Sequence, residues 1–303
     1  MTPDQIDLTD TPTSADRRGL LRTAGLGAVA LGAAAATTTV ASSLARATSS
    51  TGPTALDTEI LNFALNLEYL EAEFYLRATT GQGLQSDTGE RGTNPGTVTG
   101  GSMVPFRTNR IRLAALDIAK DEHTHVQFLR SVLGSAAVDE PTIDFAKSFN
   151  TLAQAAGFAT SFNPFADEES FLLGAYVFED VGVTAYHGAA PLISAQSGYL
   201  SPAAGILAVE AYHAGEIRSL INNSANAHLA VYAGKISNLR ATLSGGPRDD
   251  FGPITNGSFN IAPTDSNAIA FSRTTTQVLR IVYGGGAPSG YLFFPNRMNG
   301  AIR

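Results

Sequence analysis

Two segments of the chain repeat one pattern of a glutamate, a histidine and an arginine–serine pair. They are "EHTHVQFLRSVL", which begins at Glu122, and "EAYHAGEIRSLI", which begins at Glu210. Two further segments, "LEYLEAEFYLRA" and "FEDVGVTAYHGA", each place a tyrosine seven residues after a glutamate, Glu68 or Glu179. Internal self-similarity of this kind is typical of a duplicated unit. Because the two kinds of segment alternate along the chain, they predict a doubled helical hairpin.

Apolar residues recur with helical periodicity around each of these segments. The first expected helix covers about 57–81, with Thr54 or Asp57 as its N-cap and Gly81 as its end. The second covers about 108–133 and the third about 167–193. The fourth is expected to begin with Ser201 as the cap and Pro202 at its first position, and its pattern can continue to about residue 243. The fold class is therefore all-α, with a four-helix bundle at 55–243.

The connecting segments differ in length and composition. Residues 79–104 form a loop rich in glycine and threonine, and residues 135–167 form a long crossover with room for one short helix. Residues 244–303 are rich in glycine, proline and asparagine, with one expected helix at 265–283. We expect this C-terminal extension to be mostly irregular and either to pack on the bundle or to mediate oligomers.

Carboxylates stand on the apolar faces of all four helices, where an ionised group costs several kcal/mol unless it is paired. One glutamate from each of two helices, with Glu-x-x-His from each of the other two, is the ligand set of di-iron and di-manganese bundles. Residues i and i+3 project from one helix face, so such a glutamate and histidine reach one ion together. The pattern predicts two Fe or two Mn ions held by Glu68, Glu122, His125, Glu179, Glu210 and His213.

Composition narrows the chemistry further. The chain has no cysteine, which excludes disulfides, thiolate metal sites and cysteine nucleophiles. Any ion must then be held by oxygen and nitrogen donors, a shell that favours Fe, Mn or Zn. The formal net charge of -7, without a basic patch, argues against a nucleic-acid partner.

These residues resemble the ferritin-like superfamily of carboxylate-bridged dimetal bundles, which includes bacterioferritin, rubrerythrin and manganese catalase. Within it, the chain is most similar to the desiccation-related group of plants and exported bacterial proteins. The resemblance covers about residues 55–240 and rests on "LNFALNLEYLEAEFY", "DEHTHVQFLRSVLG", "NPFADEESFLLGAYVFEDVGVTAYHGAAPLI" and the stretch around Glu210, while the tail "FSRTTTQVLRIVYGGG" also looks like that group's. It implies a left-handed bundle with a long connection between helices two and three. It also implies the same six ligands, with the carboxylates of helices two and four bridging the ions. The long 79–104 loop departs from the short turn of many ferritins and argues against a cage.

Three further residues are candidates for catalytic roles beside the ligands. Glu71 lies one turn from Glu68, and is interpreted as an extra ligand, a proton relay or a gate, or alternatively as a half-exposed partner of an arginine. Tyr75 and Tyr186 are interpreted as hydrogen-bonded neighbours of the ligands or radical relays, or alternatively as plain core tyrosines.

Asp180, beside Glu179, is a candidate for holding the outer nitrogen of a ligand histidine. Arg130 and Arg218 recur at equivalent positions, and are expected either to neutralise buried acids or to form helix-end or surface ion pairs. His123 and His187 lie off the expected ligand face.

The N-terminal segment is typical of an export signal. Arg17 and Arg18 precede an apolar, alanine-rich run that is too short to span a membrane, and Ala45-Arg46-Ala47 fits a signal-peptidase site. The paired arginines indicate a Tat signal at 1–47, although Asp16 replaces the usual serine or threonine. We therefore expect export by the Tat machinery to the periplasm, cell wall or exterior, with no stable membrane span once the signal is removed.

Three functions fit this pattern. The first is an exported dimetal oxidoreductase that acts on hydrogen peroxide or dioxygen, by catalase-like dismutation or by iron oxidation. The second is a protective or structural protein of desiccation stress, in which the metal only stabilises the fold. The third is a metal-free bundle that binds partners or the cell wall. A homo-oligomer is compatible with each of them.

Overall fold

The structure, a computed structural model, describes residues 54–245, 250–286 and 291–303. The expected Tat signal and its cleavage site lie outside these residues. The helices are α2 (Ala55–Thr80), α3 (Asn109–Leu133), α4 (Phe145–Ala156), α5 (Glu168–Ala189), α6 (Leu200–Asn222), α7 (His228–Ser244) and α8 (Thr275–Val282). Short 3₁₀ turns follow α3 at Gly134–Ala136 and α5 at Ala190–Leu192. The only strands in the described part are a parallel pair, β1 (Val98–Thr99) with β2 (Ile143–Asp144), and an antiparallel pair, β3 (Ile254–Thr255) with β4 (Ser258–Phe259).

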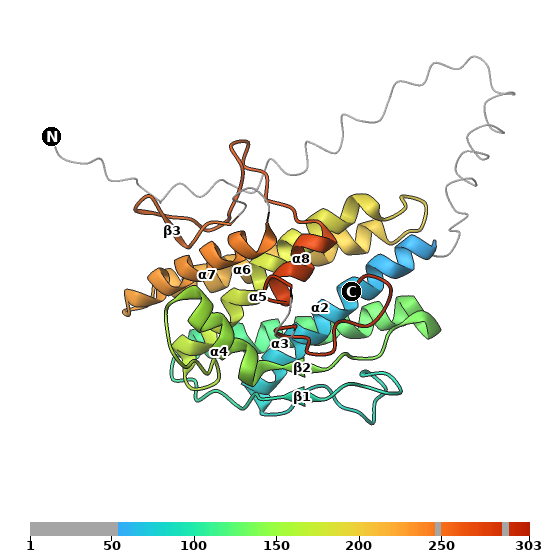
Figure 1. The fold of residues 1–303 in the computed structure, drawn as a ribbon, viewed down its shortest axis with the longest axis horizontal. Coiled ribbons are helices and arrows are strands. Elements are labelled where there is room, and N and C mark those ends of the chain that lie inside the picture. Colours follow the sequence, from blue (N-terminus) through green and yellow to red (C-terminus); the bar gives the residue numbers. More distant parts are fainter. Residues whose placement is uncertain (1–53, 246–249, 287–290) are drawn as a thin grey trace, which may run out of the picture. The chain divides into compact units, whose positions relative to one another are not determined.

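Two helical hairpins form the bundle, as the repeated segments predict. The most extensive helix contacts are those of α2 with α3 and of α5 with α6, and contacts of α2 with α5 and of α3 with α6 join the hairpins. The crossover between the hairpins carries α4 (Figure 1). An all-α bundle with a mostly irregular C-terminal region is thus confirmed. None of the helices in the described residues combines the length and the apolar character needed to cross a membrane.

Both ends of α2 follow from local chemistry. Thr54 accepts a hydrogen bond from the backbone N–H of Asp57, whose carboxylate in turn accepts one from the N–H of Thr54. This capping box satisfies two of the N–H groups that a helix start leaves unpaired. Gly81 ends the helix in the left-handed conformation, with φ of +78°, which is strained for any residue with a side chain.

An aromatic cluster packs the bundle on the side of α4. The ring of Phe74 on α2 contacts Phe171 and Phe178 on α5 and Phe145 and Phe149 on α4. All of these rings are buried, so they contribute roughly 2–3 kcal/mol each by removal of apolar surface from water. The cluster stabilises the bundle without help from any metal ion.

Polar residues on the outer face of α2 are buried as well, because loops cover them. The side chain of Asn66 donates to the carbonyl of Asn299, and its oxygen accepts from the N–H of the same residue. Glu73 accepts from the N–H of Leu84 in the 79–104 loop. These hydrogen bonds attach the loop and the end of the chain to α2.

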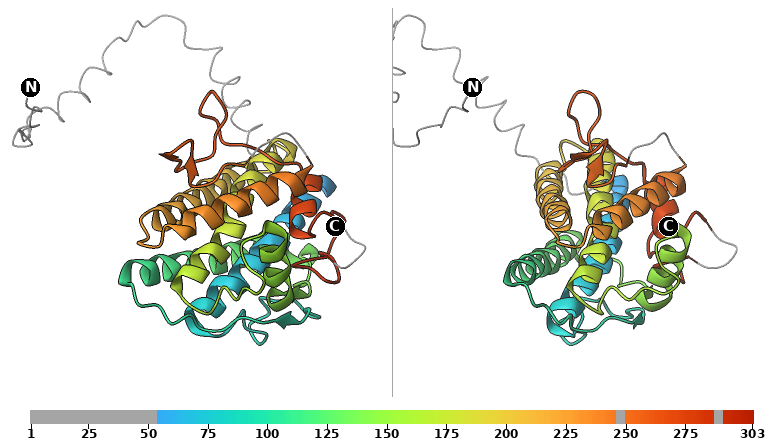
Figure 2. Two further views of the ribbon diagram at one scale, coloured as in Figure 1. Left: turned by 60° about the vertical axis from the view of Figure 1, so that its left-hand side comes forward. Right: turned by 90° about the vertical axis from the view of Figure 1, so that its left-hand side faces the viewer.

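The last two helices pack on the side of the bundle formed by α5 and α4. The helix α7 contacts both α4 and α5, and α8 contacts α7 and α5. Both views of Figure 2 show α7 and α8, in orange and red, along this side of the bundle. Phe293 continues the aromatic cluster by contacts with Phe149 and Phe178.

Both expected boundaries of the fourth helix differ in the structure. The helix α6 begins at Leu200 with Tyr199 at its N-cap and no side-chain cap, so Ser201 is not the cap and Pro202 lies two positions inside the helix. The pattern does not continue to residue 243 as one helix, because "NNSAN" interrupts it at 222–226. There Asn226 accepts from the N–H of His228, which starts α7 anew.

The tail helix is shorter than expected, covering Thr275–Val282 instead of 265–283. The side chain of Asp265 accepts hydrogen bonds from the N–H groups of Asn267 and Ile269, which fixes residues 265–269 in a turn instead of a helix. Thr274 then forms a capping box with Gln277, and the helix starts there.

Candidate metal centre

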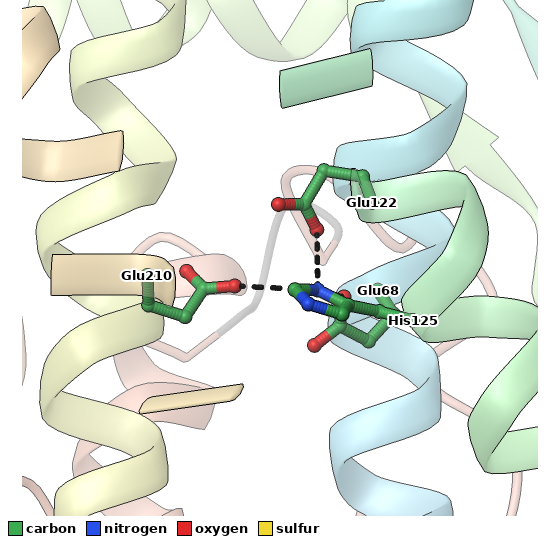
Figure 3. A group of neighbouring side chains, drawn as sticks. All are labelled: Glu68, Glu122, His125 and Glu210. Carbon is green, nitrogen blue, oxygen red and sulfur yellow. Dashed lines mark hydrogen bonds and ion pairs between the residues drawn. The ribbon is translucent and has the colours of Figure 1, made fainter. Parts of the chain in front are cut away.

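Four helices bring the six predicted ligands to one place inside the bundle. Each of the six side chains is buried, and His125, the most exposed residue of the set, is 8% exposed. In Figure 3, Glu210 projects from α6 toward three residues of the other hairpin. The six residues are Glu68 on α2, Glu122 and His125 on α3, Glu179 on α5, and Glu210 and His213 on α6.

One half of the cluster surrounds the ring of His125. Its Nδ1 lies 3.1 Å from an oxygen of Glu68, 3.5 Å from one of Glu122 and 3.9 Å from one of Glu210. These four residues each offer a donor atom within 4.8 Å of the others (Figure 3). We call this group the His125 position.

The other half surrounds His213. Its Nδ1 lies 3.0 Å from Oε1 of Glu122 and 3.6 Å from Oε2 of Glu179. Glu71 joins here, because Glu71, Glu179 and Glu210 offer donor atoms within 4.8 Å of one another. Glu71 is buried, at 4% exposure, so the half-exposed pairing with an arginine does not occur. We call Glu71, Glu122, Glu179, Glu210 and His213 the His213 position, with Glu122 and Glu210 common to both positions.

Many polar atoms of this cluster have no hydrogen-bond partner. In the described part of the chain their only nearby bases are the two histidines, and no lysine or arginine pairs with them. Burying such groups unpaired costs several kcal/mol each, and carboxylate and imidazole donors suit Fe or Mn. The residues therefore fit a bound metal. The unpartnered atoms are Oε2 of Glu71 and Glu179, both carboxylate oxygens of Glu122 and Glu210, and Nδ1 of His213.

Burial and mutual repulsion govern the ionisation of the acids. Burial raises the pKa of Glu68 to about 7 and that of Glu179 to about 8. Burial likewise raises the pKa values of Glu71 and Glu210 well above their usual range, and neighbouring carboxylates raise them further. Burial alone would raise the pKa of Glu122, but contact with both histidines outweighs it and lowers that pKa.

The pKa values of the two histidines are raised, although burial alone would lower them. Burial would lower the pKa of His125, yet the charge of Glu68 and contact with Glu122 raise it to about 11. For His213 burial also lowers the pKa, and contact with Glu122 and the charge of Glu179 raise it to about 9. Without metal, the cluster therefore holds protons in place of cations.

The two tyrosines connect the hairpins crosswise. The hydroxyl of Tyr75 on α2 donates to Glu179 on α5, and that of Tyr186 on α5 donates to Glu68 on α2. Both tyrosines are buried, and burial raises the pKa of each well above its usual value. Each tyrosine thus orients the carboxylate that the opposite hairpin supplies.

Sequence reasoning missed two residues of this centre. Asp121 lies with Oδ2 3.4 Å from Nε2 of His213, the nitrogen that points away from the cluster. Gly182 makes room for Glu210, since a Cβ there would lie 2.0 Å from Oε2 of that glutamate. The repeat gives a signal for Gly182, which aligns with Glu71, but none for Asp121, which aligns with Val209.

The interpretation of Asp180 as the partner of a ligand histidine is wrong. Its carboxylate accepts from Arg218, at 2.9 and 2.8 Å, and from Arg240, at 2.7 Å. Arg240 also pairs with Asp250, which in turn contacts Arg273 at 3.1 Å. All five side chains are buried, so of the two readings of Arg218 the neutralisation of a buried acid holds.

The remaining polar candidates lie outside the centre. Arg130 donates to the hydroxyl of Tyr69 at 2.6 Å. His123 lies 2.9 Å from Glu90, and His187 faces the carbonyl of Phe271. Both histidines are off the ligand face, as the helical phase predicts.

Comparisons with known proteins identify relatives of this chain. Residues 56–223 match the family described as the ferritin-like domain. The chain is 34% identical over 268 residues to the desiccation-related protein PCC13-62 of Craterostigma plantagineum, covering 80% of this chain and 83% of that protein. It is 29% identical over 272 residues to the ferritin-like catalase Nec2 of Nesocodon mauritianus, covering 81% and 84% respectively. No solved structure shows a significant match.

Proposed function

The chain belongs to the ferritin-like domain family, and on this basis we propose that it holds two Fe or two Mn ions for redox chemistry on hydrogen peroxide or dioxygen. The observation that carries the proposal is the set of unpartnered carboxylate oxygens beside two histidines in the interior of the bundle. The name of one relative, a ferritin-like catalase, supports the same chemistry.

Each residue of the centre has a part in this proposal. Glu122 lies near both histidines and Glu210 belongs to both groups of donors, so these two carboxylates would be shared between the ions. Glu68 and Glu179 would each serve one ion, held in place by Tyr186 and Tyr75. A pair of such ions supplies the two electrons that peroxide or dioxygen exchanges. The buried walls keep bulk water away from the reacting oxygens.

Elemental analysis of the protein from its native host, together with peroxide turnover, tests the proposal. We expect about two Fe or Mn per chain and metal-dependent oxygen release. Glu210→Gln removes a shared carboxylate and is expected to lower turnover at least about a hundredfold. Glu216→Gln is the matched control, because it lies on the same helix and only forms a surface pair with Arg110 at 3.2 Å. Wild-type protein without bound Fe or Mn would overturn the proposal.

The proposal includes export in the folded state by the Tat machinery, with the metal loaded beforehand in the cytoplasm. The paired arginines Arg17 and Arg18 and the apolar run after them support it. Replacing both arginines with lysine is expected to keep the protein in the cytoplasm of its host. Unchanged export of that variant would count against a Tat route.

A protective role without catalysis is the second candidate, favoured by the 34% identity to a desiccation-related protein. In that case the ions only neutralise the buried acids and stabilise the fold. Glu122→Ala would then lower the melting temperature, and the wild type would show no peroxide turnover. Metal-dependent turnover in the wild type excludes this role as the sole function.

A further inference from the structure

The two hairpins are related by the internal repeat, and most residues of the centre have an equivalent in the other half. Glu68 aligns with Glu179, Glu122 with Glu210, and the two histidines with each other. The tyrosine contacts obey the same symmetry, since each tyrosine binds the carboxylate of the opposite hairpin. Departures from the repeat therefore show where the two halves of the centre differ.

Two acids of the centre have no acidic equivalent in the other half, and both lie beside His213 or its neighbours. Glu71 aligns with Gly182, and Asp121 aligns with Val209. Glu71 belongs to the His213 position, where its Oε2 is buried and unpartnered. Asp121 lies 3.4 Å from the outer nitrogen of His213, whereas no described acid takes that role for His125.

The glycine in place of a second glutamate is itself required by the packing. A Cβ at position 182 would lie 2.0 Å from Oε2 of Glu210. A glutamate there cannot coexist with the observed place of Glu210. The centre thus has room for one additional carboxylate, and the chain carries it on α2 as Glu71.

From these differences we propose that the two ion positions are inequivalent and that the His213 position binds its ion first and more tightly. The proposal rests on the dimetal centre proposed above. An additional carboxylate a few ångströms from a dication raises its affinity, by about tenfold or more. A carboxylate at the outer nitrogen makes an imidazole a stronger donor and fixes its orientation. The His125 position lacks both contributions.

Titration of the metal-free full-length protein with Mn²⁺ alone tests this without any activity measurement. Free Mn²⁺ is followed by its six-line electron paramagnetic resonance signal. We expect two steps whose dissociation constants differ by about tenfold or more. The first equivalent is expected to give the spectrum of an isolated ion, and the second that of a spin-coupled pair.

The equivalent histidines form a matched pair of variants. His213→Gln is expected to remove the tight step, whereas His125→Gln retains it and loses the weak one. Glu71→Gln keeps the size and removes the charge, so the two steps are expected to merge. Glu216→Gln on the surface is the control, and far-ultraviolet circular dichroism checks that each variant is folded.

The outcomes separate this proposal from the proposed function. Two equal steps in the wild type, or equal effects of the two histidine variants, overturn the inequivalence even if peroxide turnover is intact. An unchanged titration of Glu71→Gln overturns it as well. Two distinct steps with the expected variant pattern support it even if the protein shows no peroxide turnover. Absence of Mn²⁺ binding by the wild type overturns both proposals.

Discussion

At the scale of single residues, the close contact between Gly182 on α5 and the carboxylate of Glu210 gives the sharpest test of the centre. Gly182→Ala would place a Cβ 2.0 Å from Oε2 of Glu210, so that carboxylate has to move. We expect Mn²⁺ affinity to fall at least about tenfold, while the helix itself favours alanine by up to about 1 kcal/mol. Mn²⁺ titration and circular dichroism of the same sample measure both effects.

Gly205→Ala on α6 is the control, because nothing lies within 4 Å of a Cβ at that position. It is expected to raise the melting temperature slightly and to leave the titration unchanged. If Gly182→Ala binds Mn²⁺ as the wild type does, the observed place of Glu210 is not the one used for metal.

Protons and metal ions compete for the same donors. Near pH 7 both histidines are protonated in the metal-free protein, because their pKa values are raised to about 11 and about 9. The pKa of Glu179 is raised to about 8 by burial, so this acid is also mostly protonated. Metal binding needs the deprotonated donors.

We therefore expect more than one proton to be released per ion bound at pH 7. Apparent affinity is expected to rise about tenfold or more per unit between pH 6 and pH 8. Calorimetric titration in two buffers of different ionisation enthalpy measures the proton count. Binding without proton release would contradict the charge state described here.

The ligands were predictable residue by residue, but their neighbours were not. A helix face is periodic, so four acids on apolar faces and two histidines three residues away were visible in the sequence. Asp121 touches His213 only because α3 and α6 lie side by side, and that register is a property of packing. Asp180 was misjudged because its partner Arg240 lies on a helix whose separate existence was not predicted.

At the scale of elements, two buried acids hold the 79–104 loop: Glu73 attaches it to α2, and Glu140 attaches it to the crossover. Burial and the nearby charge of Glu73 raise the pKa of Glu140 to about 8, although Arg91 pairs with it. Below about pH 4.5 Glu140 is protonated in both the folded and the unfolded chain. Between about pH 4.5 and pH 8 only the unfolded chain ionises, so folding becomes less favourable as the pH rises.

Glu140→Gln is isosteric with the protonated acid and removes this dependence. We expect its melting temperature, measured without metal, to fall less than that of the wild type between pH 5 and pH 8. Glu216→Gln on the surface is expected to follow the wild type. If the melting temperatures of the wild type and Glu140→Gln change equally with pH, Glu140 is ionised in the folded protein.

Helix interiors were predictable and several ends were not. The capping box at Thr54 and the glycine at 81 are local signals, and both hold. The interruption at 222–226 depends on Asn226, whose side chain reaches both the start of α7 and Glu169 on α5. The start of α8 depends on a turn around Asp265 that periodicity does not detect.

At the scale of the whole molecule, bound metal and the hydrophobic core contribute separately to stability. Removal of the ions by a chelator is expected to lower the free energy of unfolding by about 3 kcal/mol for each ion, if the free ion was previously present at a hundredfold excess over its dissociation constant. The helices are expected to persist, because the aromatic cluster around Phe74 contains none of the proposed ligands. Thermal unfolding followed by circular dichroism, before and after chelation, measures this. An unchanged melting temperature would mean that no stabilising ion had been bound.

The buried network of Asp180, Arg240 and Asp250 joins α5, α7 and the tail. Asp250→Asn keeps the size but removes the charge that faces Arg240 at 2.8 Å. We expect a loss of about 3 kcal/mol, since the buried guanidinium of Arg240 keeps only Asp180 as a counter-charge. Urea unfolding measures it. Asp265→Asn in the same segment, fully exposed, is the control and is expected to change little.

The match to the family ends at residue 223, yet the folded unit does not. Arg218 lies within the matched stretch, and its guanidinium donates to the carbonyls of Phe251 and Asn260 at 2.7 and 2.9 Å. A protein truncated to the matched stretch would lack the two carbonyl groups that accept hydrogen bonds from Arg218. Recombination between relatives faces the same constraint, so we expect the helix and the tail to be exchanged only together.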